Sequence, residues 1–252
     1  MNRPPLSREL ADRARREIEH GRRIASQAEA IWNWASPAGQ RRARRRAELL
    51  IRLGRLGPGV SALEVGCGTG LFTSLVARTG AEITAVDLSP ELLARARARP
   101  QCRGVRFLLA DLHSPGQLGG PYEVVFGCSI LHHLHLPTAL PHLLGALRPG
   151  GRFVFTEPNM LNPHVWLERH VPAIRRAVGA TPDETAFYRW QLCRLLERHG
   201  LTSVWVKPFD WLHPATPRVL IGPVSALGRA LEALPLIREL GGSLLIFACK
   251  RP

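Results

Sequence analysis

The chain has 252 residues, of which 45% are hydrophobic, so it is long enough to bury one large core and too apolar to be disordered over most of its length. Its 34 basic and 20 acidic residues give a net charge of +14, and only Lys207 and Lys250 are lysines, so arginine carries the charge.

The first 55 residues are predicted to form two helices that carry much of this positive charge. Apolar residues from Ile18 to Trp32 recur at helical spacing after Ser7, a candidate N-cap, and Pro37 separates this helix from a second one. The segment holds 14 arginines and six acids, a net 14 − 6 = +8, and five of the arginines lie within positions 41–46. Such an arm could meet nucleic acid, an anionic membrane surface or an anionic substrate, or it could be a solvated helix face.

The cysteines and the apolar segments indicate in which cellular compartment the protein is expected. The five cysteines are odd in number and contain no C-x-x-C pair, which argues against a disulfide framework and a structural zinc site and predicts a reducing compartment, the cytoplasm. The first 20 residues carry charges where a signal peptide needs an apolar stretch, so no export is expected. The most apolar neighbourhood, 219–240, is interrupted by four charged residues and is therefore not expected to span a bilayer. Peripheral membrane contact and the oligomeric state stay open.

From Val60 onward, short apolar runs alternate with helical stretches, which predicts β-α-β units and a doubly wound α/β fold. The expected strands, seven in all, are VSALEV, AEITAVD, VRFLLAD, YEVVFGC, RFVFTE, SVWVKPF and SLLIFACK. Between the fifth and sixth, Thr181, Pro182 and Glu184 have the spacing of a capping box, which predicts a helix that begins there and ends near Gly200.

Two segments do not fit this alternation, residues 159–180 and residues 210–242. The second contains an apolar helix face, which we expect to pack onto the domain more often than to form a lid or a membrane contact; its members are Leu220, Val224, Leu227, Leu231 and Leu234. Neither insert is long enough to hold a core of its own. We therefore expect a main domain of residues 56–252, with the arm 1–55 and the two inserts forming a cap.

A glycine-rich loop follows the first predicted strand in the sequence LEVGCGTG, residues 63–70. Glycines allow a tight turn and a close approach to a ligand, and the helix that follows offers free backbone N–H groups. Asp87, 21 positions after Gly66, ends the next strand, where a carboxylate can accept the hydroxyl protons of a ribose. Asp111 ends the third strand and could hold an adenine amino group. Three such features at successive strand ends predict a nucleotide-like cofactor.

These motifs resemble those of the class I S-adenosylmethionine-dependent methyltransferases, specifically the small-molecule branch. The resemblance covers about residues 60–157 and rests on LEVGCGTG, VDLS, LLAD, FGCSILHHL and LRPGGRFVFTEP. It implies a Rossmann-like, mostly parallel sheet of seven strands with the last strand antiparallel, and S-adenosylmethionine as the cofactor. It also implies the cofactor-binding residues: Glu64 orients the loop, Gly66, Cys67, Gly68 and Gly70 approach the methionine part, Asp87 and Leu88 the ribose, Asp111 and Leu112 the adenine, and Cys128 the methyl group.

Three other functions remain to be weighed. An NAD-binding domain would carry G-x-G-x-x-G, whereas this loop reads G-x-G-x-G. An RNA methyltransferase could use the basic arm, although the arm lacks interleaved aromatic residues and Gly127-Cys128-Ser129 stands where amino-methylating nucleic-acid enzymes carry an Asn/Asp-Pro-Pro-aromatic motif. A non-catalytic protein that only binds the cofactor stays open as well.

Methyl transfer needs aligned reactants and exclusion of water, and a base is optional. We expect a small, apolar or lipid-linked acceptor, methylated at a hydroxyl or a carbon. For a hydroxyl, His132 and His133 are the candidate bases, though they could merely pack and cap a helix. Glu157, at the end of the fifth strand, could orient the acceptor or bond backbone amides. No metal is expected, because the sequence shows no recognisable ligand cluster.

Overall fold

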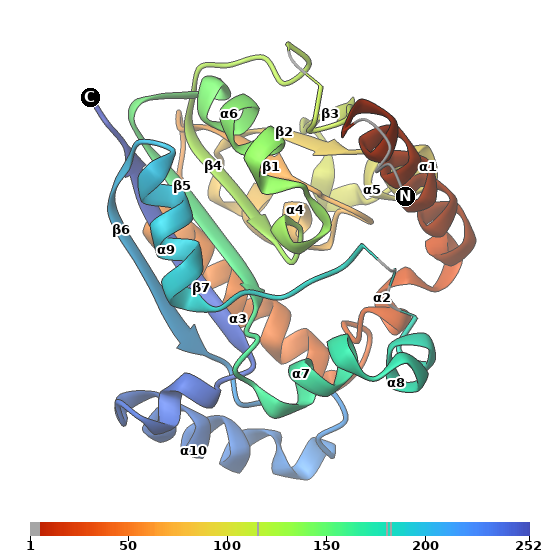
Figure 1. Cartoon of the computed structure of the whole chain (residues 1–252), viewed down its shortest axis with the longest axis vertical. Helices are drawn as coiled ribbons and strands as arrows, with labels where there is room; N and C mark the ends of the chain where they lie inside the picture. The colour runs from red at the N-terminus through yellow and green to blue at the C-terminus, as the bar shows by residue number, and fades with distance from the viewer. Residues whose placement is uncertain (1–5, 115, 180, 182) are drawn as a thin grey trace.

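A computed structural model describes residues 6–114, 116–179, 181 and 183–252. Within these residues the strands form one seven-stranded sheet in the order β3-β2-β1-β4-β5-β7-β6 (Figure 1). Its members are β1 (Ser61–Val65), β2 (Glu82–Asp87), β3 (Arg106–Leu109), β4 (Tyr122–Cys128), β5 (Leu147–Pro158), β6 (Leu201–Phe209) and β7 (Ser243–Lys250). β7 runs antiparallel to both of its neighbours, and the other paired strands are parallel. The predicted fold class is confirmed.

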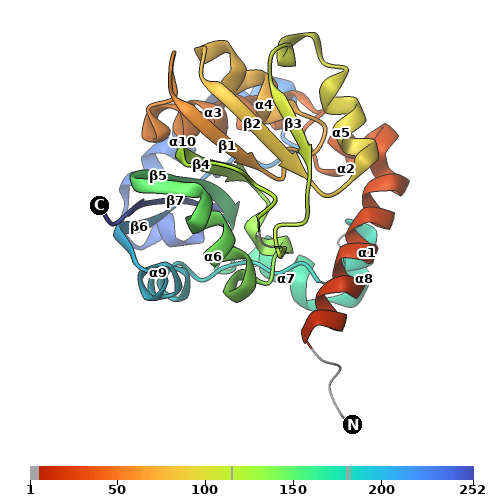
Figure 2. The same cartoon turned by 90° about the horizontal axis from the view of Figure 1, so that it is seen from above.

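Helices cover both faces of the sheet (Figure 2). On one face lie α6 (Leu136–Ala146) and α9 (Arg189–Arg198), packed on Val125 and Phe153. On the other lie α3 (Pro37–Gly54), α4 (Leu71–Val76) and α5 (Pro90–Arg97), packed on the alternate residues Val124 and Val154. Because neighbouring strand residues point to opposite faces, each continuously apolar strand supplies both cores.

The N-terminal arm differs in part from the prediction. α1 (Leu6–Ile24) already includes Ser7, so this serine is not the N-cap, and the helix breaks before the short α2 (Ala28–Ile31). Pro37 is the first residue of α3, with Ser36 as the N-cap through a hydrogen bond from Gly39 N. α3 buries Leu50 against the sheet, so this part of the arm belongs to the core.

The predicted capping box does not begin a helix. Thr181 N donates to Glu184 Oε1 at 2.7 Å, but Thr181 Oγ1 donates to Glu17 on α1, and α9 begins only at Arg189. Pro182, the third residue of that prediction, lies outside the described residues. The local hydrogen bond expected from the sequence forms within a loop that crosses to α1.

The two inserts are helical. The first contains α7 (Pro163–His170) and α8 (Pro172–Ala177), and the second contains α10 (Ile221–Ala233) between two short 3₁₀ turns, η5 (Arg218–Leu220) and η6 (Ile237–Leu240). Figure 1 shows α7 and α10 at the same end of the molecule. None of the helices described has the length and apolar character needed to cross a membrane.

Candidate functional site

A cavity of about 460 Å³ lies at the carboxyl ends of the parallel strands. The loops after β1, β2 and β4 form its floor, while α1, α2, α3 and α7 supply further walls. In doubly wound folds ligands bind outside these strand ends, where the chain turns into helices on both faces. The cavity is therefore the candidate site.

The glycine-rich loop is shaped for a close approach. Gly66 and Gly68 line the cavity with φ of +66° and +52°, and a Cβ on Gly66 would lie 2.3 Å from the Ile130 side chain. Gly70, with φ of +76°, packs on Ala96 instead and is not among the lining residues. Cys67 lines the cavity, and burial raises the pKa of its thiol, which keeps it neutral.

Glu64 lies beneath this loop rather than in the cavity wall. Its carboxylate is buried, burial raises its pKa to about 8, and its Oε2 has no hydrogen-bond partner among the described residues. A buried oxygen without a donor is costly, so the site has room for one more cationic or N–H donor group. The amino group of a methionine-like cofactor has that chemistry.

Asp87 and Asp111 both reach the cavity, as predicted. Asp87 accepts the backbone N–H groups of Gly68 at 2.7 Å and Ser89 at 2.9 Å, so the carboxylate holds the glycine loop as well as facing the cavity. Asp111 accepts from His113 N at 2.9 Å. Both retain lone pairs for a bound polyol or amine.

Leu88, Leu112 and Cys128 also line the same cavity. Together with the glycine turns, Asp87 and Asp111, they form a polar and apolar cradle that fits S-adenosylmethionine.

His132, just after β4, and Glu157, near the end of β5, form a buried pair. Glu157 Oε1 accepts the N–H groups of Ile130 at 2.9 Å and Leu131 at 2.8 Å, and its Oε2 lies 2.7 Å from His132 Nδ1. His132 lines the cavity, whereas Glu157 is not among its lining residues. Glu157 thus positions the loop and the imidazole, and of the two groups His132 is the one that can touch an acceptor.

The pKa values of this pair favour a neutral imidazole. Burial lowers the pKa of His132 well below its ordinary value, and the neighbouring His133 lowers it further. Burial also raises the pKa of Glu157 to about 7, against the pull of its backbone N–H donors. Above that pH the carboxylate holds the Nδ1 proton, which leaves the Nε2 lone pair free.

His133 has the opposite character. Burial lowers its pKa, but Glu17 Oε2, 3.2 Å from its Nδ1, outweighs burial and raises the pKa overall. Burial raises the pKa of Glu17, and the contact with His133 reverses this and lowers it to about 2. α1 therefore supplies the carboxylate that raises the pKa of His133, and the pKa values of two adjacent histidines shift in opposite directions.

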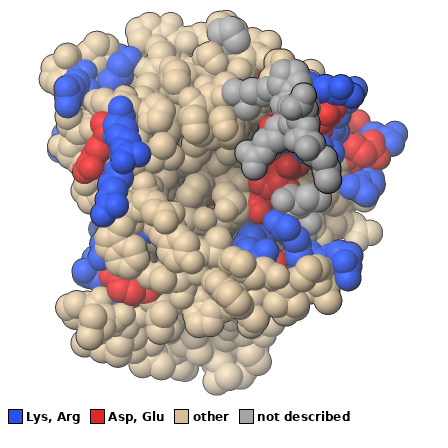
Figure 3. Space-filling model, viewed as in Figure 1, with Lys and Arg blue, Asp and Glu red and all other residues tan. Residues whose placement is uncertain are grey.

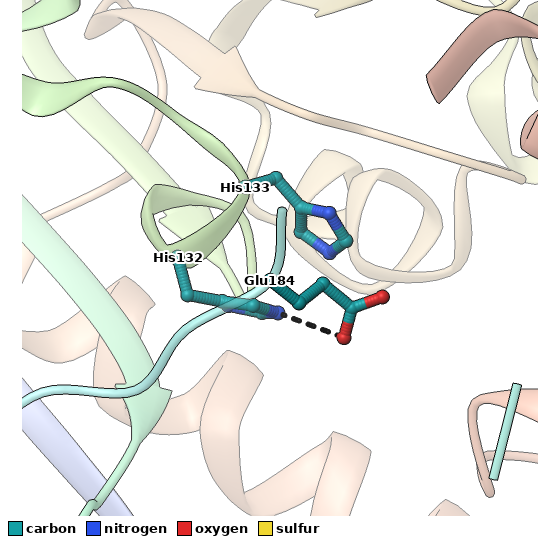
Figure 4. A group of neighbouring side chains, drawn as sticks. All are labelled: His132, His133 and Glu184. Atoms are coloured by element: carbon teal, nitrogen blue, oxygen red, sulfur yellow. Dashed lines mark ion pairs between the residues drawn. The ribbon is translucent and has the colours of Figure 1, made fainter. Parts of the chain in front are cut away.

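Glu184 completes this group (Figure 4). Its Oε2 lies 4.0 Å from His132 Nε2 and accepts from Arg169 Nη1 at 2.9 Å. In the part of the chain that is described, His132, His133 and Glu184 offer ligand atoms within 4.8 Å of one another, the separation at which a metal ion could be held. The expectation of no metal rested on the absence of a recognisable ligand cluster in the sequence, and these three residues approach one another only in the folded chain; the expectation stays a prediction.

Several site residues carried no sequence signal. Glu17, Glu184 and Arg169 come from segments that only tertiary structure brings to the histidines. The same holds for a buried ion group in the cavity wall, in which Asp210 accepts from Arg42 Nε at 2.9 Å and Arg46 Nη1 at 2.5 Å. The sequence showed the arginine cluster at 41–46. It did not show that a single carboxylate, more than 160 residues later, would pair with two of its members.

Comparison with known proteins agrees with this geometry. Residues 62–151 match the family model described as a methyltransferase domain. The chain is 32% identical over 152 residues to the ubiquinone biosynthesis O-methyltransferase of Aeromonas salmonicida, which is 57% of this chain and 63% of that protein. It is 33% identical over 110 residues to the malonyl-[acyl-carrier protein] O-methyltransferase of Serratia marcescens, covering 43% of this chain and 42% of that protein. The alignments thus span less than two thirds of these relatives.

Solved structures share the fold over nearly the whole chain. The N-methyltransferase NodS of Bradyrhizobium japonicum, determined with S-adenosyl-L-homocysteine, has a TM-score of 0.63 at 17% identity, covering 93% of this chain and 98% of that one. An S-adenosylmethionine-dependent methyltransferase of Mesorhizobium loti has a TM-score of 0.60 at 21% identity, covering 82% of this chain and 98% of that one.

The sheet order, the glycine loop and the acidic strand ends define a class I methyltransferase fold. Residues 62–151 match a methyltransferase domain, and the chain shares the fold of S-adenosylmethionine-dependent methyltransferases, as its motifs predicted.

Proposed function

We propose that the protein binds S-adenosylmethionine and transfers its methyl group to a hydroxyl oxygen of a small, apolar or lipid-linked metabolite. One observation carries an acceptor that loses a proton: a buried His132, with its pKa lowered and its Nδ1 held by Glu157, lines the cavity that also contains Asp87 and Cys128, and the O-methyltransferase relatives favour oxygen over carbon. A hydroxyl loses a proton when it is methylated, and a neutral imidazole is suited to accept it.

The bound cofactor would supply an electrophilic methyl group on a sulfonium. Gly66, Gly68 and Asp87 would hold it at the strand ends, in the same cavity that Cys128 and His132 line. His132 Nε2 takes the acceptor proton, and Glu157 keeps the Nδ1–H in place and stabilises the imidazolium that forms. α1 and α7 exclude water from the reacting groups.

The character of the remaining walls supports an apolar acceptor. Trp34, Phe72 and Trp211 line the cavity. Aromatic side chains bury large apolar areas and favour ring or chain-like ligands. Both relatives compared above are named as O-methyltransferases, which agrees with an oxygen acceptor. The five cysteines are free thiols, which supports a reducing compartment, the cytoplasm.

The basic arm gives less support to an RNA acceptor. Of the arginines at 41–46, Arg42 and Arg46 pair with Asp210 inside the protein, and Arg45 pairs with Glu232. These three charges are therefore neutralised within the fold and are not free to meet phosphates.

The proposal is tested by calorimetric titration with S-adenosylhomocysteine, followed by transfer of a radiolabelled methyl group to hydrophobic phenols, prenyl lipids, glycolipids and bulk RNA. We expect binding, and transfer to one of the hydroxyl compounds that His132→Ala lowers on the order of a hundredfold or more. A folded protein that does not bind the cofactor would refute the activity. Transfer to RNA alone would refute the acceptor class, and binding without transfer to any acceptor would favour a non-catalytic protein.

A further inference from the structure

The second insert presents an exposed apolar surface. Val219 is 83% exposed, Leu236 86% and Leu227 59%, and Leu220, Leu234 and Ile237 are also exposed. On α10 the buried position is Gly228, where the Trp211 side chain packs. Of the predicted stripe, Leu220, Leu227 and Leu234 are exposed, whereas Val224 and Leu231 are half-buried, so only part of the stripe packs onto the domain.

This surface continues onto neighbouring elements. Leu240 O of η6 accepts a hydrogen bond from Asn162 Nδ2 at the start of α7, where Trp166 and Leu167 are exposed. Arg189 at the start of α9 pairs with Glu239 of η6, beside the exposed Trp190. We call this continuous surface of residues 219–240, α7 and Trp190 the apolar face. Figure 3 shows the corresponding lower part of the molecule with few charged atoms.

The charges around the apolar face are unbalanced. Its acids are already paired, Glu232 with Arg45 at 2.5 Å and Glu239 with Arg189 at 2.7 Å. Arg218 and Arg229 are exposed, and no acid pairs with either of them in the described structure. What remains at the edge of the apolar face is positive charge.

Two further arginines add to this edge. Arg41 and Arg44 of α3 line a groove together with Arg229 and the exposed Glu48, so three guanidinium groups and one carboxylate gather along one side of α10, and the net charge there is positive. An apolar helix face bordered by unpaired cations is the pattern of proteins that lie on membrane surfaces.

We propose that the apolar face docks on the surface of a bilayer that contains anionic lipids, with the side chains of residues 219–240 in the interface and the bordering arginines on lipid phosphates. A second copy of this chain is a poorer occupant, since a two-fold contact would bring the same arginines against one another with Glu48 as the one exposed acid among the groove residues to meet them. The inference goes beyond the proposed function, because it concerns binding to lipid and requires no particular acceptor.

The experiment is sedimentation of the full chain with vesicles of phosphatidylcholine, alone or with about one third phosphatidylglycerol, at low and high salt. We expect binding that is strongest on the anionic vesicles and weakens with salt. Leu227→Asp and Leu236→Asp should each weaken it about tenfold or more, and Arg229→Gln on the order of fivefold. Leu109→Asp and Arg103→Gln, which change exposed residues outside the apolar face, are the matched controls and should leave binding unchanged.

Circular dichroism melts and light scattering accompany each variant. An unchanged melting temperature shows that the variant is folded, as expected for exposed positions. No vesicle binding by the wild type, or equal losses in the control variants, would overturn the proposal. So would a dimer in solution that Leu236→Asp converts to monomer, because the apolar face would then be an interface between copies.

Discussion

At the scale of single residues, the two adjacent histidines show how a neighbouring group shifts the pKa of a side chain. The pKa of His133 is raised because Glu17 faces it, and burial together with the neighbouring His133 lowers the pKa of His132. Glu157 fixes the tautomer of His132 by taking the Nδ1 side, so the Nε2 side faces the cavity as the lone pair. The proposed base therefore depends on two carboxylates, neither of which needs to touch the acceptor.

The pH dependence follows from Glu157, whose pKa is raised to about 7 by burial. Below that pH the protonated carboxyl donates to Nδ1 and the Nε2 lone pair is lost, so kcat/KM should rise with pH through about 7. Glu157→Gln should lower kcat on the order of a hundredfold and remove this rise, since the amide does not titrate. Glu197→Gln, an exposed acid on α9, is the control. A rise near pH 7 that survives in Glu157→Gln would show that another group titrates.

Asp87 is expected to determine cofactor affinity. Asp87→Ala removes two acceptor bonds to a ribose, each worth roughly 1.5–3 kcal/mol, so the Kd for S-adenosylhomocysteine should rise at least about tenfold. The glycine loop also loses its tie through Gly68 N, which acts in the same direction. Glu82→Ala, at the exposed opposite end of β2, should leave the Kd unchanged. Equal affinity in wild type and Asp87→Ala, measured by titration, would place the ribose elsewhere.

Chelation should not affect the enzyme, even though His132, His133 and Glu184 converge. Arg169 already occupies Glu184 Oε2 at 2.9 Å, and Glu17 faces His133 Nδ1. Neighbouring ligands of a tetrahedral ion lie roughly 3.4 Å apart, closer than the 4.0 Å between His132 Nε2 and Glu184 Oε2. We expect turnover and melting temperature to survive EDTA. A loss restored by zinc or another divalent ion would show that the cluster is a metal site.

Sequence spacing could predict the site residues at strand ends, and not those that come from the arm. Asp87 and Asp111 follow apolar runs and must reach the same sheet edge. Glu17 and Glu184 have no such constraint, because nothing in a helix or loop sequence tells which distant histidine it will face. The sequence pattern therefore predicted the acidic residues of the cavity wall at the strand ends. It did not predict the carboxylates that surround the proposed base.

At the scale of elements, Asp210 links α3 to the end of β6. It lies between Arg42 and Arg46, and Arg46 is stacked between the rings of Trp34 and Phe209 at 5.2 and 5.3 Å. Burial raises the pKa of Asp210, but the two guanidinium groups outweigh burial and lower it to about 2. The contact between α3 and the end of β6 is therefore electrostatic as well as apolar.

Asp210→Asn should destabilise the fold by about 3–5 kcal/mol, because it leaves buried arginine charge uncompensated. A folded-state pKa below the unfolded value stabilises the protein above the unfolded pKa of about 3.9, and this contribution is lost as pH falls toward about 2. Urea unfolding should show a large difference from wild type at neutral pH that shrinks below about pH 4. Asp12→Asn, which breaks an exposed pair with Arg15, should change stability by less than about 1 kcal/mol. A similar loss in both variants would contradict the role of burial.

Local sequence signals placed some elements correctly and others not. The strands followed from their apolar runs, but the Thr181 motif predicted a helix start seven residues too early, since Thr181 bonds Glu17 instead of a first turn. The stripe on α10 was recognised as helical, yet periodicity reports only that a face is apolar. Whether another part of the chain covers that face depends on the tertiary arrangement.

At the scale of the whole molecule, the arm divides into a part that completes the core and a part that covers the site. α3 contributes Leu50 to the sheet core, whereas α1 reaches the cavity through Glu17 and is tied to the loop before α9 by Arg16, whose Nε lies 2.7 Å from Asp183 Oδ2. The alternation of strands and helices could predict the sheet from sequence, but not this division, because both parts of the arm show the same amphipathic pattern.

Two truncations separate these roles. Removal of residues 1–55 takes away α3 and should yield a protein without a cooperative unfolding transition. Removal of residues 1–24 leaves the core, the glycine loop and Asp87 intact, so the protein should fold and the Kd for S-adenosylhomocysteine should rise less than about tenfold. Turnover should fall on the order of a hundredfold, because water enters the cavity and His133 loses Glu17. Thermal melts, titration and methyl transfer on the same two proteins measure all three quantities. Full turnover without α1 would show that this helix is no cover for the site.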